Sequence, residues 1–205
     1  MISILTPSIR PEYLKMLQEC LERQTFQDFE WLTEVGLRNR GFDLPKAMNR
    51  MLKRAKGDMI YIIQDCITIP DNFLEATKDK YPTDFVTFPL EKNGQFDWRK
   101  NRDGQIMPEE WESDLAKAPI QAFFDIGGYD EDYCQGWSWD NVEVAYRAKA
   151  AGYRFQCVNS IHGTVLDHDS LIKHPFRNKL KNNDARARQT KGESERGYYK
   201  KEYLI

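Results

Sequence analysis

The sequence lacks the features that mark membrane, secreted or zinc-binding proteins. No apolar stretch approaches the roughly 20 residues of a membrane span, and residues 1–7 are one short apolar run without a basic leader. We therefore expect neither a spanning helix nor a signal peptide. The cysteines form no CxxC pair and are widely scattered, at Cys20, Cys66, Cys134 and Cys157. This spacing favours free thiols in a reducing cytosol, so we expect a cytoplasmic protein.

A strong excess of one charge is also missing. The chain has 30 Lys and Arg against 32 Asp and Glu, a net charge of -2, which argues against a wholly basic nucleic-acid-binding protein. The sequence shows no internal repeat. Its 205 residues, 40% hydrophobic and 30% charged, suit one globular domain with a substantial core, with or without a tail.

Strand-like and helix-like segments alternate along the first part of the chain, which predicts an α/β fold with a parallel sheet and helical crossovers. Residues 91–119 are largely polar and show no clear pattern, and residues 177–201 are polar with more basic than acidic side chains. The latter predict a surface helix or a partly ordered tail. Strands are expected at residues 2–6, 29–35 and 59–65, and helices at 12–23, 45–55, from Pro70, and at 142–151.

Asp65 stands out because it ends an apolar run that begins at Met59. Such a run is typical of a buried strand, and open α/β sheets bind their ligands at the carboxyl ends of the strands. A carboxylate there suits a hard cation beside a nucleotide diphosphate. For an isolated Asp, a turn or strand-capping role without chemistry is the more common explanation.

The densest group of functional residue types lies in residues 125–141. Paired glycines allow a turn that bulkier residues would forbid. Trp137 and Trp139 offer indole faces on which the C–H face of a sugar ring stacks. Asp140 opens the following helix, where it is expected as the helix cap and, in the same position, as the acceptor of a hydroxyl proton.

Three segments together carry a family resemblance. Residues 2–14 resemble an opening strand followed by a Pro-Thr-x-x-Arg nucleotide loop, and residues 24–30 resemble a Gln-Thr-Tyr-x-Asp-Phe-Glu turn. Residues 127–147 resemble a Gly-Gly-Phe-Asp-Glu … Gly-Trp-Gly-x-Glu-Asp … Arg block. In this order they resemble a GT-A-fold glycosyltransferase of family 2 whose C-terminal part is similar to the galactosyltransferase family 7 module. The similarity covers roughly residues 1–75 and 120–170.

The resemblance implies one GT-A-type, Rossmann-like domain over residues 1–175, with a mostly parallel central sheet flanked by helices. Residues 1–90 would bind the nucleotide-sugar and residues 91–175 the acceptor, leaving 176–205 as the polar, basic C-terminal helix or tail. A UDP-sugar is the default donor, although Thr33–Gly36 replace the family's Val-Asp-Asp-Gly-Ser. The donor-binding residues that it implies are Thr6, Pro7, Ser8, Arg10, Glu34, Lys46, Asn49, Gln64 and Asp65. For Lys46 and Asn49 an exposed helix start is the alternative.

The resemblance also implies a divalent metal, Mn²⁺ or Mg²⁺, on the donor diphosphate. Ile63 stands at the first position of the family's Asp-x-Asp motif, so Asp65 is its one remaining carboxylate. The family's later histidine would be a second ligand, and His168 is preferred to His162 and His174. The alternative for each histidine is a surface or hydrogen-bonded structural residue that binds no metal.

For the chemistry, the family's acidic pair appears here as Asp140-Asn141. An amide cannot accept the proton, so the resemblance makes Asp140 the general base of an inverting transfer to a saccharide hydroxyl, with Trp137, Trp139 and Asn141 at the acceptor. Two alternatives stay open. The acceptor would be a modified DNA base if the basic tail tracks phosphates, and a catalytically degenerate protein would bind nucleotide or sugar without turnover.

Overall fold

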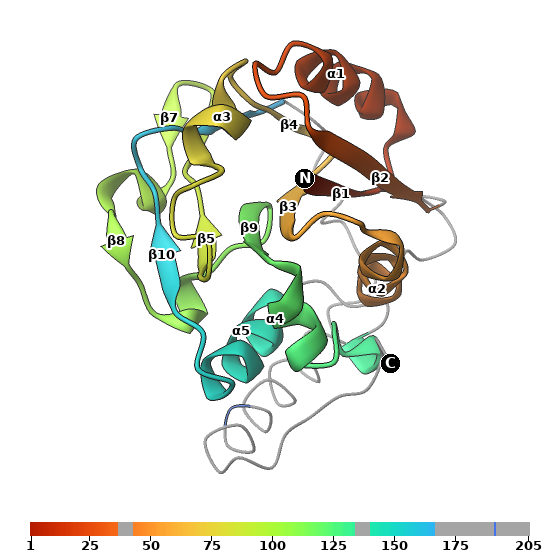
Figure 1. Cartoon of the computed structure of the whole chain (residues 1–205). Coiled ribbons are helices and arrows are strands. Elements are labelled where there is room, and N and C mark those ends of the chain that lie inside the picture. Colours follow the sequence, from red (N-terminus) through yellow and green to blue (C-terminus); the bar gives the residue numbers. More distant parts are fainter. Residues whose placement is uncertain (37–42, 134–139, 167–190, 192–205) are drawn as a thin grey trace, which may run out of the picture.

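The computed structural model of the chain describes residues 1–36, 43–133, 140–166 and 191. Within them the strands form a seven-stranded sheet, ordered β2-β1-β3-β9-β5-β10-β8, and a four-stranded sheet, ordered β4-β11-β6-β7 (Figure 1). The strands are β1 (Ile2–Ser8), β2 (Phe29–Val35), β3 (Met59–Ile63), β4 (Ile67–Thr68), β5 (Phe85–Thr87), β6 (Leu90–Lys92), β7 (Gln95–Phe96), β8 (Gly104–Gln105), β9 (Leu115–Pro119), β10 (Phe155–Cys157) and β11 (Gly163–Val165). The α-helices are α1 (Pro11–Glu22), α2 (Leu44–Arg54), α3 (Phe73–Thr77), α4 (Ile120–Asp125) and α5 (Asp140–Ala150), with 3-10 turns η1 (Trp98–Asn101), η2 (Pro108–Glu110) and η3 (Glu131–Tyr133).

The large sheet is mixed: three of its strand pairings are parallel, as the sequence predicts, and three are antiparallel. Strand β1 pairs in parallel with β2 and β3, and β10 pairs in parallel with β5. Strand β9 runs antiparallel between β3 and β5, and β8 runs antiparallel at the edge. The strands β1, β2, β3, β5 and β10 therefore point one way, and their carboxyl ends share one edge. The predicted α/β class is confirmed.

Alternating residues of the central strands feed two cores, one on each face of the sheet. Leu5, Ile60 and Ile62 pack with α2, α4 and α5, whereas Ile4 and Tyr61 pack with α1 and α3. Figure 1 shows the two helix groups on either side of the strands. Because β1 and β3 are covered on both faces, their sequences read as continuous apolar runs.

Helix α2 begins where the sequence predicts. The side chain of Asp43 accepts a hydrogen bond from the Lys46 amide at 3.3 Å, and a proline occupies the first turn. Beyond the helix, Gly57 lies against β1. A Cβ at this position would stand 2.5 Å from the backbone nitrogen of Ser3, so only glycine fits this close approach.

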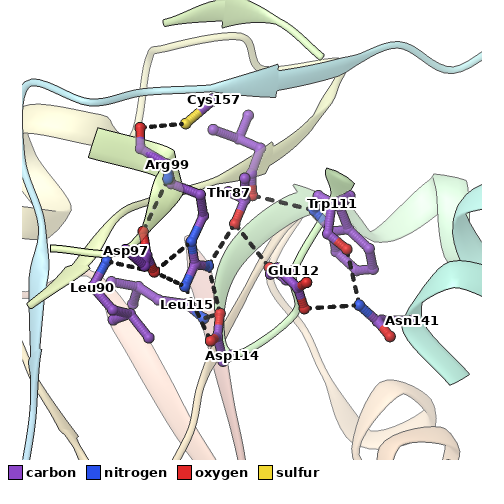
Figure 2. A network of polar contacts seen from close by, with 11 residues as sticks. Thr87, Leu90, Asp97, Arg99, Trp111, Glu112, Asp114, Leu115, Asn141 and Cys157 are labelled. Carbon is purple, nitrogen blue, oxygen red and sulfur yellow. Dashed lines mark hydrogen bonds and ion pairs between the residues drawn. The ribbon is translucent and has the colours of Figure 1, made fainter. Parts of the chain in front are cut away.

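The polar stretch 91–119 folds around a buried arginine. The side chain of Arg99 is 3% exposed and pairs with Asp97 at 2.5 Å and with Asp114 at 2.6 Å. It also donates to the hydroxyl of Thr87 at 3.0 Å (Figure 2). Two carboxylates and a hydroxyl thus compensate the buried guanidinium, which explains why so polar a segment is ordered.

The described residues can be compared with the predictions on membrane spans and on cysteines. None of the helices found there is long and apolar enough to span a bilayer. The three cysteines within that part, Cys20, Cys66 and Cys157, are buried free thiols. Cys134 lies outside the described residues.

Candidate active site

A small pocket lies at the carboxyl edge of β1 and β3, where open α/β sheets bind their ligands. It encloses about 10 Å³, the space that one water-sized group needs. It brings together three of the predicted site residues, Pro7, Gln64 and Asp140. The full lining consists of Pro7, Leu44, Met48, Ile62, Gln64, Ser113, Tyr129 and Asp140.

Asp140 is the first residue of α5 and is partly buried. Burial raises the pKa of its carboxyl from 3.8 to about 6, and the charge of Glu143 adds to this, against backbone hydrogen bonds at the helix start. The group is therefore ionised at neutral pH yet more basic than an ordinary aspartate. Such a pKa suits a general base.

The first turn of α5 is held by an ion pair inside the core. Glu143 and Arg147 are completely buried and lie 2.5 Å apart, one helical turn from each other. Arg147 also donates to the backbone oxygen of Ile126 at 2.6 Å. The pair therefore ties the helix that carries Asp140 to the glycine turn.

Asn49 of α2 ties the same turn from the other side. Its side-chain amide donates to the Tyr129 carbonyl at 2.9 Å, and its oxygen accepts from the Tyr129 amide at 2.8 Å. Gly127 and Gly128 have φ of 77° and 85°, as the predicted turn requires. Asn49 is buried with its amide engaged by this turn and by Glu131. Lys46, also predicted at the donor, is exposed and pairs with Asp43 at 3.0 Å.

The sequence predicts a strand that ends on Asp65, but β3 ends at Ile63, so Asp65 lies just beyond it. The pocket lining includes its neighbour Gln64 and not Asp65. The Asp65 carboxylate is 2% exposed and accepts from Arg10 at 2.7 Å and from the Ser8 hydroxyl at 2.7 Å. A second Arg10 nitrogen lies 3.4 Å from it. The predicted nucleotide loop and the predicted metal ligand thus meet in one buried ion pair.

The remaining predicted donor residues lie around the ends of β1 and β2. The Thr6 hydroxyl is buried and accepts from the indole of Trp31 at 2.9 Å. Glu34, near the end of β2, pairs with Arg50 and Arg54 of α2, each at 2.9 Å. The two arginines hold this carboxylate over the exposed side of α2.

The described residues do not by themselves form a metal site. No group of three His, Cys, Asp or Glu side chains gathers within them, and Asp65 faces Arg10. His162 lies 3.7 Å from Glu91 and packs its ring against Phe96. His168 and His174 lie outside the described residues, as do Trp137 and Trp139.

Neither a protein-family model nor a curated protein matches this sequence, but solved structures match. Residues 1–349 of TarS from S. aureus, in complex with UDP-GlcNAc, give a TM-score of 0.68 at 14% identity, covering 94% of this chain and 71% of that chain. Mannosyltransferase PcManGT from Pyrobaculum calidifontis, in complex with GDP-Man and Mn²⁺, gives 0.61 at 12% identity, covering 96% and 74%. GalNAc-T7 with UDP, GalNAc and Mn²⁺ gives 0.71 at 12% identity, covering 97% and 50%.

The chain has the GT-A fold. At these identities the likeness concerns the arrangement of strands and helices and assigns no residue. Within the GT-A fold, the pocket at the ends of β1 and β3 joins the predicted nucleotide loop to the start of α5. The predicted fold is therefore confirmed, whereas the predicted site residues stay predictions.

Sequence reasoning missed Glu112, which contacts the predicted site residue Asn141. The amide of Asn141 donates to the Glu112 carboxylate at 3.2 Å and to the Trp111 carbonyl at 2.9 Å (Figure 2). Burial and the charge of Asp114 raise the pKa of Glu112 to about 7. The sequence signal was weak because Glu112 is one of several carboxylates in a polar segment.

Asn141→Asp is expected to destabilise the fold by about 2–3 kcal/mol, because two hydrogen bonds are lost and a carboxylate faces both Glu112 and the Trp111 carbonyl. Urea unfolding at neutral pH measures this, and acidification should reduce the loss by protonating the new pair. Asn72→Asp is the matched control, because Asn72 is exposed and makes no capping bond. Equal stability of both variants would contradict the assigned contact.

Proposed function

We propose that this chain is a glycosyltransferase that moves a sugar from a nucleotide-diphosphate-sugar to a hydroxyl of a saccharide acceptor. The observation that carries the proposal is the position of Asp140. In a GT-A fold, Asp140 lines the pocket at the strand ends together with Pro7 of the predicted nucleotide loop. The sequence motifs favour family 2, with a C-terminal part like the family 7 module.

The proposed reaction is an inverting displacement. The Asp140 carboxylate takes the proton of the acceptor hydroxyl, whose oxygen forms the new bond to the anomeric carbon. The bond from that carbon to the diphosphate oxygen breaks, and the nucleoside diphosphate leaves with the electron pair. A base with a pKa of about 6 holds the proton well enough to take it from a hydroxyl as the bond forms.

The donor and the acceptor are assigned to the two parts of the chain that the sequence predicts. Residues 1–90 are proposed to hold the donor and residues 91–175 the acceptor, with a UDP-sugar as the default donor. The neighbour structures contain UDP, UDP-GlcNAc and GDP-Man, which makes these nucleotides the first to test. Mn²⁺ accompanies two of them, but the described residues of this chain offer Asp65 only in its pair with Arg10.

The test is a binding and product assay on the full chain. Thermal unfolding is followed with UDP, UDP-GlcNAc, GDP and GDP-mannose, each with and without Mn²⁺, because a ligand of the native state raises the melting temperature. The best donor is then incubated with saccharide acceptors, and NMR reads the anomeric configuration of the product. Binding without release of nucleoside diphosphate to any acceptor or to water would favour a non-catalytic binding protein.

A further inference from the structure

The hydroxyl of Tyr129 is a buried polar group that the fold does not use. The side chain is 1% exposed, and within the described residues its oxygen has no hydrogen-bond partner. A buried hydroxyl without a partner is costly, and natural structures satisfy nearly all of them. Tyr129 is also one of the residues that line the pocket, so a ligand group bound there is a candidate partner for the hydroxyl.

Both the backbone and the ring of Tyr129 are held in place by neighbouring residues. Asn49 binds both its backbone amide and its carbonyl. Its ring stacks on Phe123, with centroids 5.9 Å apart and planes 14° from parallel. The hydroxyl is therefore held in place before a ligand arrives, which is the arrangement that makes a binding contact effective.

The chemistry of the pocket selects a neutral hydroxyl group. Asp140 accepts hydrogen bonds and repels anions, and none of the eight lining residues is cationic. A phosphate is therefore disfavoured there. Gln64 and Ser113 both donate and accept, and Pro7, Leu44, Met48 and Ile62 supply an apolar wall, the usual mixture in small-molecule pockets. The enclosed space of about 10 Å³ accommodates one such group.

We propose that Tyr129 is a ligand-binding residue whose hydroxyl, together with the Asp140 carboxylate, holds one hydroxyl group of the bound saccharide. Tyr129 donates to the saccharide oxygen, and the saccharide O–H donates to Asp140. The saccharide as ligand class rests on the proposed function. The unpartnered hydroxyl and the pocket stand independently of it.

The test compares two buried tyrosines. In Tyr129→Phe no hydrogen bond within the protein is lost, so the melting temperature should stay unchanged or rise. Tyr61→Phe is the matched control, because the buried Tyr61 hydroxyl lies 2.8 Å from the Thr77 hydroxyl and its loss should lower the melting temperature. The ligand response should fall in Tyr129→Phe and stay unchanged in Tyr61→Phe, since only Tyr129→Phe removes a ligand contact.

The ligand readout is the difference between UDP-GlcNAc and UDP, or GDP-mannose and GDP, in thermal shift. In Tyr129→Phe this difference should become smaller while the shift with nucleotide alone stays unchanged. Alternatively, if the pocket binds the acceptor, KM for the saccharide acceptor should rise about 2- to 10-fold. Neither change should occur in Tyr61→Phe. A wild-type difference in thermal shift and wild-type KM in Tyr129→Phe would overturn the inference and assign a trapped water to the hydroxyl.

Failure of the proposed function has a different signature, because wild-type protein would then bind none of the nucleotides. In that case GlcNAc, GalNAc and mannose are titrated directly against wild type and Tyr129→Phe. A response of wild type that the variant loses supports the inference without any transferase activity. No response, or an equal one, overturns it.

Discussion

Asp140→Asn is expected to lower the rate of sugar transfer by about 10²- to 10⁴-fold, the usual contribution of a general base. The amide keeps the size of the side chain but cannot accept the proton. Donor binding should persist, because the substitution leaves the strand ends and Arg10 untouched. Transfer is measured as nucleoside diphosphate released in the presence of acceptor. Asp28→Asn is the control, since the Asp28 carboxylate is 68% exposed and pairs with the N-terminal amine.

The same substitution is expected to stabilise the protein at neutral pH. Because the native pKa of about 6 lies above the ordinary value of 3.8, the native state binds more protons than the unfolded state between these values. The wild type therefore loses stability as the pH rises through this window, by at most about 3 kcal/mol, and Asp140→Asn does not. Melting temperatures of both proteins across the window measure the effect.

The two readouts separate a catalytic carboxylate from a structural one. If Asp140 had only a structural role, the substitution would lower the stability of the protein, and activity would fall only as far as the folded fraction falls. If burial disfavours the charged form of a catalytic Asp140, the substitution instead raises stability and lowers turnover, as is common at active sites. The acid limb of the wild-type rate profile should fall near pH 6 for the same reason. An Asp140→Asn variant that transfers sugar at the wild-type rate would refute the base assignment.

Most of the parallel half of the fold could be predicted, because its signals are local. The apolar runs at β1 and β3 reflect burial on both faces, and Asp43 and the proline after it mark the start of α2. Strand β9 escaped prediction although it lies at the centre of the sheet. Its sequence is short, contains two alanines and a lysine, and ends in proline. The lysine, Lys117, is buried because it donates to the carbonyls of Thr77 and Lys78 at the end of α3.

In the candidate site, too, the local features could be predicted and the tertiary contacts could not. The positions of Asp140 and of the glycine turn follow from sequence, since a carboxylate and paired glycines have local roles. The partners of Asp65 and Asn141 do not, because Arg10 and Glu112 approach them only through tertiary packing. An Asp that alone suggested a metal ligand is thus found in a buried ion pair. Sequence could place the carboxylate at the sheet edge, yet it could not say what the carboxylate binds.

Breaking the Arg10–Asp65 pair is expected to destabilise the protein by about 3–5 kcal/mol for either single substitution, Arg10→Met or Asp65→Asn, because the remaining buried group loses its partner. The double variant should recover part of the loss, and the double-mutant cycle gives the coupling energy. Urea unfolding measures all four proteins. Arg23→Met is the control, because the Arg23–Asp71 pair is more than half exposed on both sides and should contribute little.

The same variants decide whether Asp65 also holds a cation. If the carboxylate serves only Arg10, Mn²⁺ with UDP raises the melting temperatures of the wild type and Arg10→Met by equal amounts. If Asp65 ligates the metal, the ion replaces the missing guanidinium charge. The rise in melting temperature should then be larger for Arg10→Met than for the wild type, and smallest for Asp65→Asn. The second pattern would show that Arg10 and the metal compete for one carboxylate. Donor binding would then exchange an internal ion pair for a metal contact, and the lone Asp65 would suffice without a second aspartate at Ile63.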